Sequence, residues 1–401
     1  MLNSNTIVDA DGHIMEPADM WETFSDPKYR DRCVRIQRDE SDGDKLIIRG
    51  APSRRIRRLG GIRYSPSGES VNWDTLNGLE YYESYRNSCH PASYDPRERL
   101  AWMDRQNIDI SILFPSLGLI WTSEAISDPD YIRAGAQAYN RWILEFCEAG
   151  KDRLVAVAQT VLFDMRQAVG DLYELKEAGF AHIMLPLVAP DSATCFHSDF
   201  DEFWTVVQEL NFIVHLHKVA IPHQLNIPAA SQLGRKGNGA FFNHVNETLA
   251  APMCLLSLMD NRIPDRFPNI KFAFLECNAG WLPAWLDRTD ESYEVLQSKK
   301  AALLQAPPRH YIEQTDNFFF GLSLAEDVTR LDSITDRLLI ATDFPHPGAS
   351  IAPVDDWNNR LDALTPVSRT SILGGNALRL LDFQLETERR NSLCSTVNSA
   401  E

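Results

Sequence analysis

The stretch Ile7-Val8-Asp9-Ala10-Asp11-Gly12-His13 organises the fold that the sequence predicts. Its first residues are apolar and β-branched, which favours a strand, and Gly12 is typical of the turn that ends one. Because side chains alternate along a strand, we expect Asp9, Asp11 and His13 on one face, with Asp11 and His13 nearest the carboxyl end. A carboxylate and an imidazole two residues apart can hold one metal ion together, although such a pair could also simply cap a turn.

From residue 95 onward, short apolar segments alternate with helical segments. We expect strands near residues 110, 156, 183, 214, 273, 320 and 340, in addition to the strand at residue 7. The intervening helices are expected at 95–103, 129–148, 165–178, 199–210, 246–261, 282–304, 325–333, 355–364 and 368–381. This alternation is typical of parallel β/α units. Eight strands favour a closed (β/α)8 barrel, and an open doubly wound sheet is the alternative.

One domain is expected over residues 1–383. Residues 25–94 are polar and rich in glycine, which indicates an insertion or cap after the first strand that lines or covers the pocket. Within it, 45–49 could form a small strand paired with 55–59. Residues 384–401 are polar and are expected to be a disordered tail.

Composition limits the classes of function. The 401 residues carry a formal net charge of -17, which argues against a nucleic-acid partner. The seven cysteines are scattered without a C-x-x-C pair, as in a reduced intracellular protein. No apolar run approaches the ~20 residues that a membrane span requires. We therefore expect a cytoplasmic protein that acts on a small molecule.

Residue types that bind metals recur where the predicted strands end. Asp11 and His13 follow the first strand, His217 ends the fifth, Glu276 the sixth and Asp343 the eighth. The carboxyl ends of barrel strands converge on one mouth, where chemistry takes place. Residues far apart in sequence would therefore meet around one site. The candidate ligands are Asp11, His13, His217, His244, Glu276 and Asp343.

Several of these residues have alternative roles. His217 is nearer the mouth than His215, which could be a hydrogen-bonded neighbour of a ligand. His244 precedes a helix and could cap it instead of facing the site. His346 could orient a ligand or touch substrate. Glu276 follows four apolar residues, so its burial would be costly without a cation or a donor.

The chain resembles the amidohydrolase-related family, in the branch that includes aminocarboxymuconate semialdehyde decarboxylase. The resemblance covers residues 8–381 apart from the insertion, and implies a distorted TIM barrel, a centre of one or two divalent metal ions, and an oligomer such as a dimer. It is carried by Asp9-Ala10-Asp11-Gly12-His13 with Glu16-Pro17, residues 104–109, Tyr139-Asn140-Arg141-Trp142, Arg266-Phe267-Pro268, Phe274-Leu275-Glu276 with Gly280-Trp281, and Thr342-Asp343-Phe344-Pro345-His346.

The chain also departs from the pattern of the family. The family's first-strand H-x-H becomes Asp11-x-His13, its fifth-strand histidine corresponds to His217 and its eighth-strand aspartate to Asp343. Where the decarboxylases carry a catalytic histidine, this chain has Glu276, and the bridging lysine of many two-metal members is missing from strand four. Oxygen ligands suit Mn or Fe as well as Zn. Six candidates exceed the three or four ligands of one catalytic zinc, which allows two metals.

Three functions follow. The first is a metal-dependent enzyme that hydrolyses or decarboxylates a small organic acid, amide or ester through a metal-activated water. In it, Asp343 or His244 would transfer protons and Glu276 would bind metal or position the water. The second is a dinuclear non-haem iron or Mn/Fe monooxygenase, with Glu276 and His244 at the second metal. The third is a metal-free binding protein on the same barrel.

Overall fold

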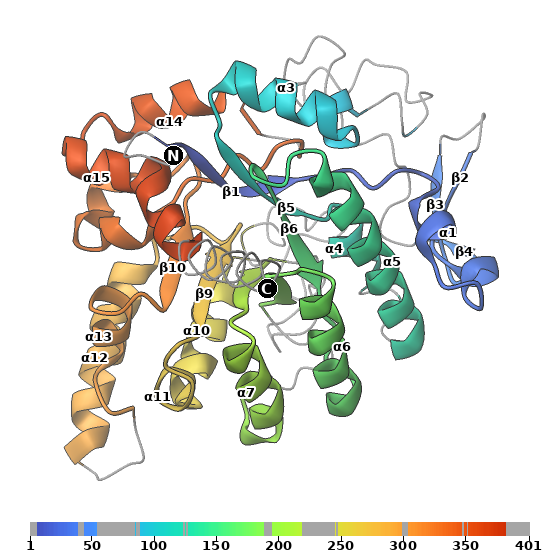
Figure 1. Ribbon diagram of the computed structural model, residues 1–401. Helices are drawn as coiled ribbons and strands as arrows, with labels where there is room; N and C mark the ends of the chain where they lie inside the picture. The colour runs from blue at the N-terminus through green and yellow to red at the C-terminus, as the bar shows by residue number, and fades with distance from the viewer. Residues whose placement is uncertain are drawn as a thin grey trace, which may run out of the picture.

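Eight parallel strands form one sheet in the computed structural model (Figure 1). The structure describes residues 6–38, 44–53, 85, 89–122, 125, 127–187, 195–218, 245, 248–298, 304–346, 349–350 and 352–381. The sheet order is β1-β5-β6-β7-β8-β9-β10-β11. The strands are β1 (Val8–His13), β5 (Ile110–Phe114), β6 (Leu154–Gln159), β7 (His182–Pro186), β8 (Ile213–His217), β9 (Lys271–Leu275), β10 (Phe318–Gly321) and β11 (Leu338–Leu339). These are the eight strands that the sequence predicts. The expectation that Gly12 ends the first strand is wrong, because β1 continues through Gly12 to His13 and pairs there with β5.

Backbone hydrogen bonds join β1 to the residues that follow β11, so the sheet curls into a nearly closed barrel. Ala10 N–H donates to the carbonyl of Ile340 at 3.0 Å, and Asp343 N–H donates to that of Asp11 at 2.9 Å. His13 N–H donates to the carbonyl of Phe344 at 2.7 Å. We call this junction between β1 and residues 340–344 the seam. The predicted barrel is confirmed, and the open sheet is wrong.

Both faces of the strands are buried, as expected for a parallel sheet. The barrel interior is filled by side chains such as Val8, Ile112, Val157, Ala273 and Phe319, all fully buried. A larger apolar cluster lies between the barrel wall and the surrounding helices. Burying apolar side chains on both faces is the main stabilising term of such a fold.

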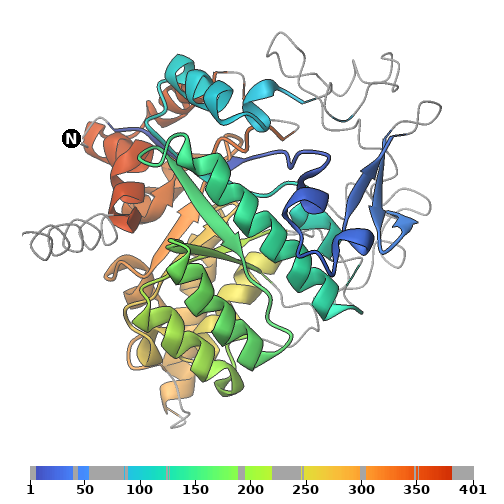
Figure 2. The same cartoon turned by 45° about the vertical axis from the view of Figure 1, so that its right-hand side comes forward.

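Helices surround the barrel (Figures 1 and 2). An aspartate before each of α3, α5 and α6 accepts backbone N–H groups of the first turn, which fixes where these helices begin. The helices are α3 (Pro96–Gln106), α4 (Gly118–Trp121), α5 (Pro129–Glu148), α6 (Met165–Glu177), α7 (Asp201–Glu209), α10 (Ala250–Asp260), α11 (Ile263–Arg266), α12 (Leu282–Ser298), α13 (Pro308–Glu313), α14 (Pro353–Leu361) and α15 (Pro366–Thr370).

Two of the predicted helices differ in type. The segment expected as a helix at 325–333 is a 3-10 segment, η7 (Val328–Arg337), with non-helical backbone at Leu331 and Ile334. The last predicted helix, 368–381, contains a π-helical turn, η8 (Ser371–Gly375), between α15 and helical residues 376–381. Short 3-10 turns also occur at η1 (Arg30–Arg32), η4 (Pro91–Ser93) and η6 (Ser198–Phe200).

The segment after β1 carries its own small structure. It contains α1 (Met20–Phe24) and an antiparallel sheet of β2 (Arg35–Gln37), β3 (Lys45–Ile48) and β4 (Ala51–Pro52). The predicted strand at 45–49 is therefore present, and it pairs with β2 and β4. Its expected partner at 55–59 lies outside the described residues, as does the tail at 384–401. The division into one domain, an insertion and a tail stays a prediction.

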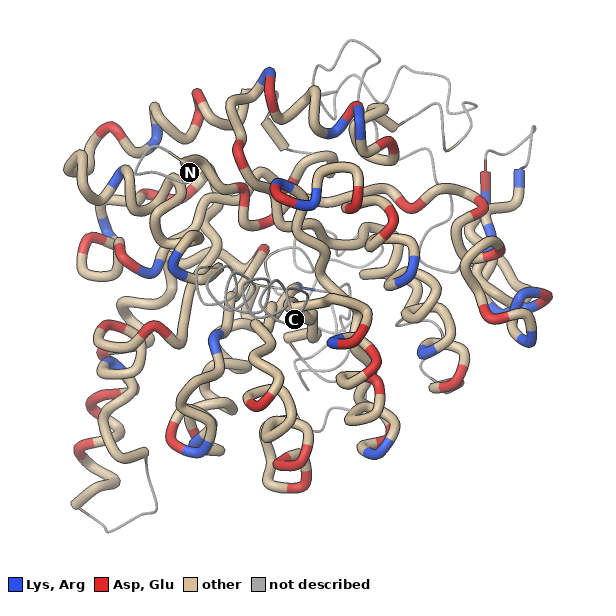
Figure 3. The backbone as a smooth tube through the Cα atoms, in the orientation of Figure 1, with Lys and Arg blue, Asp and Glu red and all other residues tan. Residues whose placement is uncertain are grey.

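Figure 3 shows that positions of Lys and Arg are interspersed with those of Asp and Glu along the outer helices and the small sheet after β1. None of the described helices has both the length and the apolar composition needed to cross a bilayer.

Candidate metal centre

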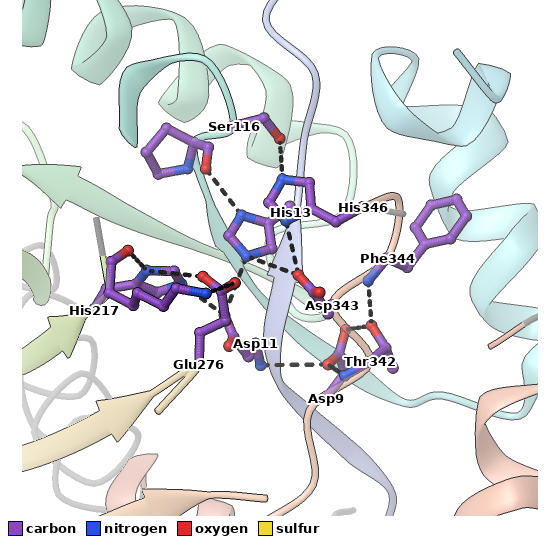
Figure 4. Close-up of polar contacts among 12 residues, drawn as sticks. Asp9, Asp11, His13, Ser116, His217, Glu276, Thr342, Asp343, Phe344 and His346 are labelled. Carbon is purple, nitrogen blue, oxygen red and sulfur yellow. Dashed lines mark hydrogen bonds and ion pairs between the residues drawn. The ribbon is translucent and has the colours of Figure 1, made fainter. Parts of the chain in front are cut away.

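Four ligand-type side chains from three remote segments meet at the carboxyl end of the barrel (Figure 4). Asp11 and His13 come from β1, His217 ends β8, and Asp343 follows β11. His217 Nε2 lies 3.2 Å from Asp11 Oδ1, and His13 Nε2 lies 3.4 Å from the same oxygen. His13 Nε2 is also 3.5 Å from Asp343 Oδ1. The convergence predicted from the strand ends is therefore present for these four residues.

The backbone orients both imidazoles. His13 Nδ1 is 2.9 Å from the carbonyl oxygen of Pro115, and His217 Nδ1 is 2.7 Å from that of Lys218. A carbonyl can only accept, so each Nδ1 carries a proton and donates it. In the neutral imidazole, each Nε2 then presents a lone pair to the centre, which is the usual way a protein prepares a histidine for a metal.

Two buried polar atoms at the centre have no hydrogen-bond partner among the described residues. They are Asp11 Oδ2 and His13 Nε2. Their residues are 1% and 0% exposed, and an unsatisfied polar atom at such depth costs about 1–3 kcal/mol. A divalent cation would satisfy both atoms. The donor set of two imidazoles and two carboxylates also fits Zn, Mn or Fe.

Asp11 and His217 form a buried ion pair. Burial alone would raise the pKa of Asp11, but the two neighbouring imidazoles lower it well below its usual range. Burial alone would lower the pKa of His217, but the charge and hydrogen bond of Asp11 raise it to about 9. Without a metal, a proton on His217 therefore takes the place of the cation beside Asp11.

His346 belongs to a second, overlapping group of ligand-type atoms with His13 and Asp343. Its Nδ1 lies 2.8 Å from Asp343 Oδ1, its Nε2 lies 2.8 Å from Ser116 Oγ, and its ring stacks on that of His13. The Ser116 hydroxyl donates to the carbonyl of Ile14 at 2.7 Å. His346 is thus hydrogen-bonded to Asp343, one of the candidate ligands. This contact agrees with a role of His346 in orienting the Asp343 carboxylate.

Glu276 lies beside the centre but outside both ligand groups. Its Oε1 is 3.3 Å from Lys218 Nζ, and its Oε2 is 3.9 Å from Nδ1 of His217, on the side of the ring that faces the Lys218 carbonyl. The donor that stabilises the carboxylate here is therefore a lysine ammonium. Its predicted role as a metal ligand is not tested by this geometry.

Asp9 does not share a face with Asp11, contrary to the simple alternation of a strand. The β1–β5 register shifts between Asp9 and Gly12, so that an irregularity turns Asp11 into the barrel. Val8 and Ala10 instead face the interior next to Asp9. The Asp9 side chain lies on the outer side of the barrel wall, where it accepts a hydrogen bond from Ser111 Oγ at 2.8 Å.

Two further histidines considered from the sequence are His215 and His244. His215 Nε2 is 2.9 Å from His182 Nδ1, so His215 pairs with a neighbour inside the barrel, and His182 is structural. Burial lowers the pKa of His182 to about 3. His244 lies outside the described residues.

Sequence reasoning missed Ser116 and Lys218. Lys218 directly follows β8 and Ser116 lies two residues after the end of β5, but neither is a common metal ligand, so a search for ligand types passes over them.

Comparisons with known proteins agree with this architecture. The family model described as amidohydrolase matches residues 8–383. No curated protein sequence matches the chain.

Solved structures of similar fold cover nearly the whole chain. An amidohydrolase from Mycobacterium avium subsp. paratuberculosis K-10 is 18% identical with a TM-score of 0.76, covering 95% of this chain and 100% of its own. The 5-carboxyvanillate decarboxylase of Novosphingobium aromaticivorans, complexed with manganese, is 16% identical with a TM-score of 0.64 (95% and 100%). A 2,6-dihydroxybenzoate decarboxylase from Rhizobium is 18% identical with a TM-score of 0.61 (94% and 99%). At these identities the likeness shows the fold.

Proposed function

The chain belongs to the amidohydrolase family, and from this premise we propose that it is a metal-dependent enzyme that hydrolyses or decarboxylates a small organic acid, amide or ester. The observation that carries the proposal is the pair of buried, unpartnered atoms Asp11 Oδ2 and His13 Nε2 among the described residues. Their residues, Asp11 and His13, form with His217 a group of ligand-type atoms that lie within 4.8 Å of one another. Two similar structures are decarboxylases by name, one of them holding manganese.

Asp11, His13, His217 and Asp343 would hold the metal. When bound, a divalent metal supplies Lewis-acid chemistry, which polarises a substrate oxygen and makes water a better nucleophile. Two residues at the centre would supply the other functions, which are proton transfer and orientation of water or substrate. Asp343 is one-third exposed and bonded to His346, so it can exchange protons between the site and the mouth. Glu276, held by Lys218, orients water or substrate next to the metal site.

The two-metal monooxygenase is the second candidate function. It is favoured by the overlap of the two ligand groups, because His346 adds an imidazole next to Asp343 beyond the four ligands that one metal would use. Anaerobic purification followed by metal analysis and oxygen-uptake measurements separates the two candidates. One Zn or Mn per chain and no oxygen uptake supports the hydrolase or decarboxylase. Two Fe or Mn per chain with oxygen uptake supports the monooxygenase, and no metal at all contradicts both.

Replacing Glu276 with glutamine should leave metal affinity unchanged while lowering turnover. The Glu276 carboxylate forms an ion pair with Lys218 and is in neither ligand group, so replacing it removes no metal ligand. A group that orients or exchanges protons contributes about 10²–10⁴-fold to rate. We therefore expect a loss of at least ~100-fold in kcat on a substrate found by screening carboxylated phenols, amides and esters. A variant that loses its metal would instead identify Glu276 as a ligand.

Metal affinity should rise with pH up to about 9. A metal must displace the proton that Asp11 holds on His217, whose pKa is raised to about 9. Below that pH, we expect the apparent affinity to increase about tenfold per pH unit for this one proton. Calorimetry in buffers of different ionisation enthalpy would count the released proton. Affinity that is flat between pH 6.5 and 9 would contradict the assignment.

The raised pKa of His217 should also make the stability of the metal-free protein fall with rising pH, whereas metal affinity rises. Because the pKa of His217 is higher in the folded than in the unfolded chain, the stabilisation is complete below about pH 6.5 and is lost as pH rises to about 9. The midpoint of chemical unfolding of the metal-free protein should fall across this window. A midpoint that is constant or rises there would show that His217 is not protonated beside Asp11.

A further inference from the structure

A fully buried carboxylate, that of Asp9, lies behind the barrel wall next to the metal centre. It is 0% exposed and accepts four hydrogen bonds. Two come from the backbone: Asp11 N–H at 3.3 Å and Thr342 N–H at 3.0 Å, both to Oδ1. Two come from hydroxyls: Ser111 at 2.8 Å and Thr342 at 3.0 Å, both to Oδ2. One side chain thus ties together β1, β5 and the segment after β11.

On the β1 side, Asp9 stabilises the irregularity that exposes Asp11 to the centre. The register shift begins at Asp9, and the N–H group that it accepts is that of Asp11 itself. In a regular strand, Asp9 and Asp11 would point the same way. The hydrogen bond therefore belongs to the local geometry that turns one aspartate outward and the other into the barrel.

On the other side of the seam, Asp9 holds the residue before Asp343. Both the N–H and the hydroxyl of Thr342 donate hydrogen bonds to the Asp9 carboxylate. The same hydroxyl accepts a hydrogen bond from the N–H of Phe344 at 3.2 Å. Asp343 sits between them with a positive φ of 54°, a conformation that residues other than glycine rarely adopt. Contacts on both flanks fix this strained residue, so its carboxylate faces His13.

The cluster around Asp9 has no spare room. Arg99, 0% exposed, donates to the carbonyl of His13 at 2.9 Å and reaches Ser111 Oγ at 3.5 Å. A Cβ added at Gly12 would lie 2.6 Å from Asp9 Oδ2 and 2.7 Å from Arg99 Nη2. The carboxylate is therefore held in a single arrangement by its neighbours.

We propose that Asp9 is a positioning residue that sets Asp11 and Asp343, on opposite sides of the seam, in the geometry required to bind one metal ion. The inference rests on the proposed function, since it concerns the same metal centre. Asp9 does not touch the metal; it acts through Thr342 and through the backbone of Asp11. Residues that hold metal ligands in this way typically change metal affinity by about 10–100-fold when replaced.

Mn²⁺ titration by calorimetry tests this directly. Asp9→Asn removes the charge with little change of shape, and Thr342→Val removes the hydroxyl but keeps the volume. Both should bind Mn²⁺ about 10–100-fold more weakly than wild type. Thr342→Ser keeps the hydroxyl and should therefore bind Mn²⁺ nearly as tightly as wild type. With Co²⁺ as the probe, the visible spectrum of Thr342→Val should differ from wild type, because the coordination geometry changes.

A matched control separates positioning from general stability. Asn376 is 1% exposed and donates two hydrogen bonds of 2.7 Å, to the carbonyls of Thr335 and Leu338, away from the centre. Asn376→Ala should lower the unfolding midpoint but keep wild-type Mn²⁺ affinity.

The outcomes are distinguishable. Wild-type affinity in Thr342→Val, or an equal loss in Asn376→Ala, would overturn the role of Asp9 while leaving the metal site intact. Failure of the wild-type protein to bind Mn²⁺, Zn²⁺ or Fe²⁺ would overturn the proposed function itself. If Asp9→Asn does not fold, the comparison of Thr342→Val with Thr342→Ser still decides.

Discussion

Replacing Asp11 with asparagine should weaken metal binding by more than ~100-fold, because even residues that only hydrogen-bond a ligand change affinity by roughly 10–100-fold. Asp11 contacts both imidazoles of the centre through one oxygen, and its other oxygen is buried without a partner among the described residues. Asparagine keeps the size of the side chain but offers no negative charge to the cation. The same substitution removes the group that raises the pKa of His217.

Metal content after purification and Mn²⁺ titration measure this effect. Asp164→Asn is a matched control: Asp164 precedes α6 and accepts the N–H of Gln167, and asparagine caps helices as well as aspartate does. The control should keep wild-type metal content. If Asp11→Asn kept it too, Asp11 would not be a metal ligand, and the assignment of the centre to these four side chains would be wrong.

Replacing Gly12 with alanine should destabilise the protein by about 3 kcal/mol, at the upper end of the range for overpacking. The new methyl group would approach Ser111 Oγ to 2.5 Å and Asp9 Oδ2 to 2.6 Å. Both atoms are hydrogen-bonded to each other and fully buried, so neither can move without breaking that bond. Because the disturbed atoms belong to the Asp9 cluster, metal affinity should fall together with stability.

Chemical unfolding of the metal-free protein measures the change in stability. Gly170→Ala is the control, since Gly170 lies inside α6 with no atom within 4 Å of an added Cβ. Alanine there should stabilise the helix by about 0.5–1 kcal/mol. Equal stabilities of Gly12→Ala and wild type would mean that the cluster around Asp9 is not tightly packed.

The barrel and the main ligand set follow from local patterns in the sequence. The apolar segments that lead to His217 and Asp343 can be recognised one at a time, and the symmetry of a parallel barrel brings their ends together. This is why residues as far apart along the chain as Asp11 and Asp343 can be assigned to one site from the sequence alone.

What could not be predicted depends on contacts between segments. A period of two places Asp9 with Asp11, but the bulge in β1 is fixed by Ser111 and Thr342, which lie far away in sequence. The strand predicted near residue 340 already ends at Leu339, and Thr342 after it donates its N–H to Asp9. The pairing of Glu276 with Lys218 depends on how two side chains from neighbouring strands meet.

Other expectations concern features that this structure does not test. The dimer, the location in the cytoplasm and any role of His244 stay predictions.

Anomalous diffraction from crystals of the manganese-loaded protein tests the central claim most directly. Data collected at the manganese absorption edge should show a peak among Asp11, His13, His217 and Asp343, within coordination distance of atoms from all three segments. A peak elsewhere, or full occupancy of manganese in solution with no peak between these four side chains, would contradict the account.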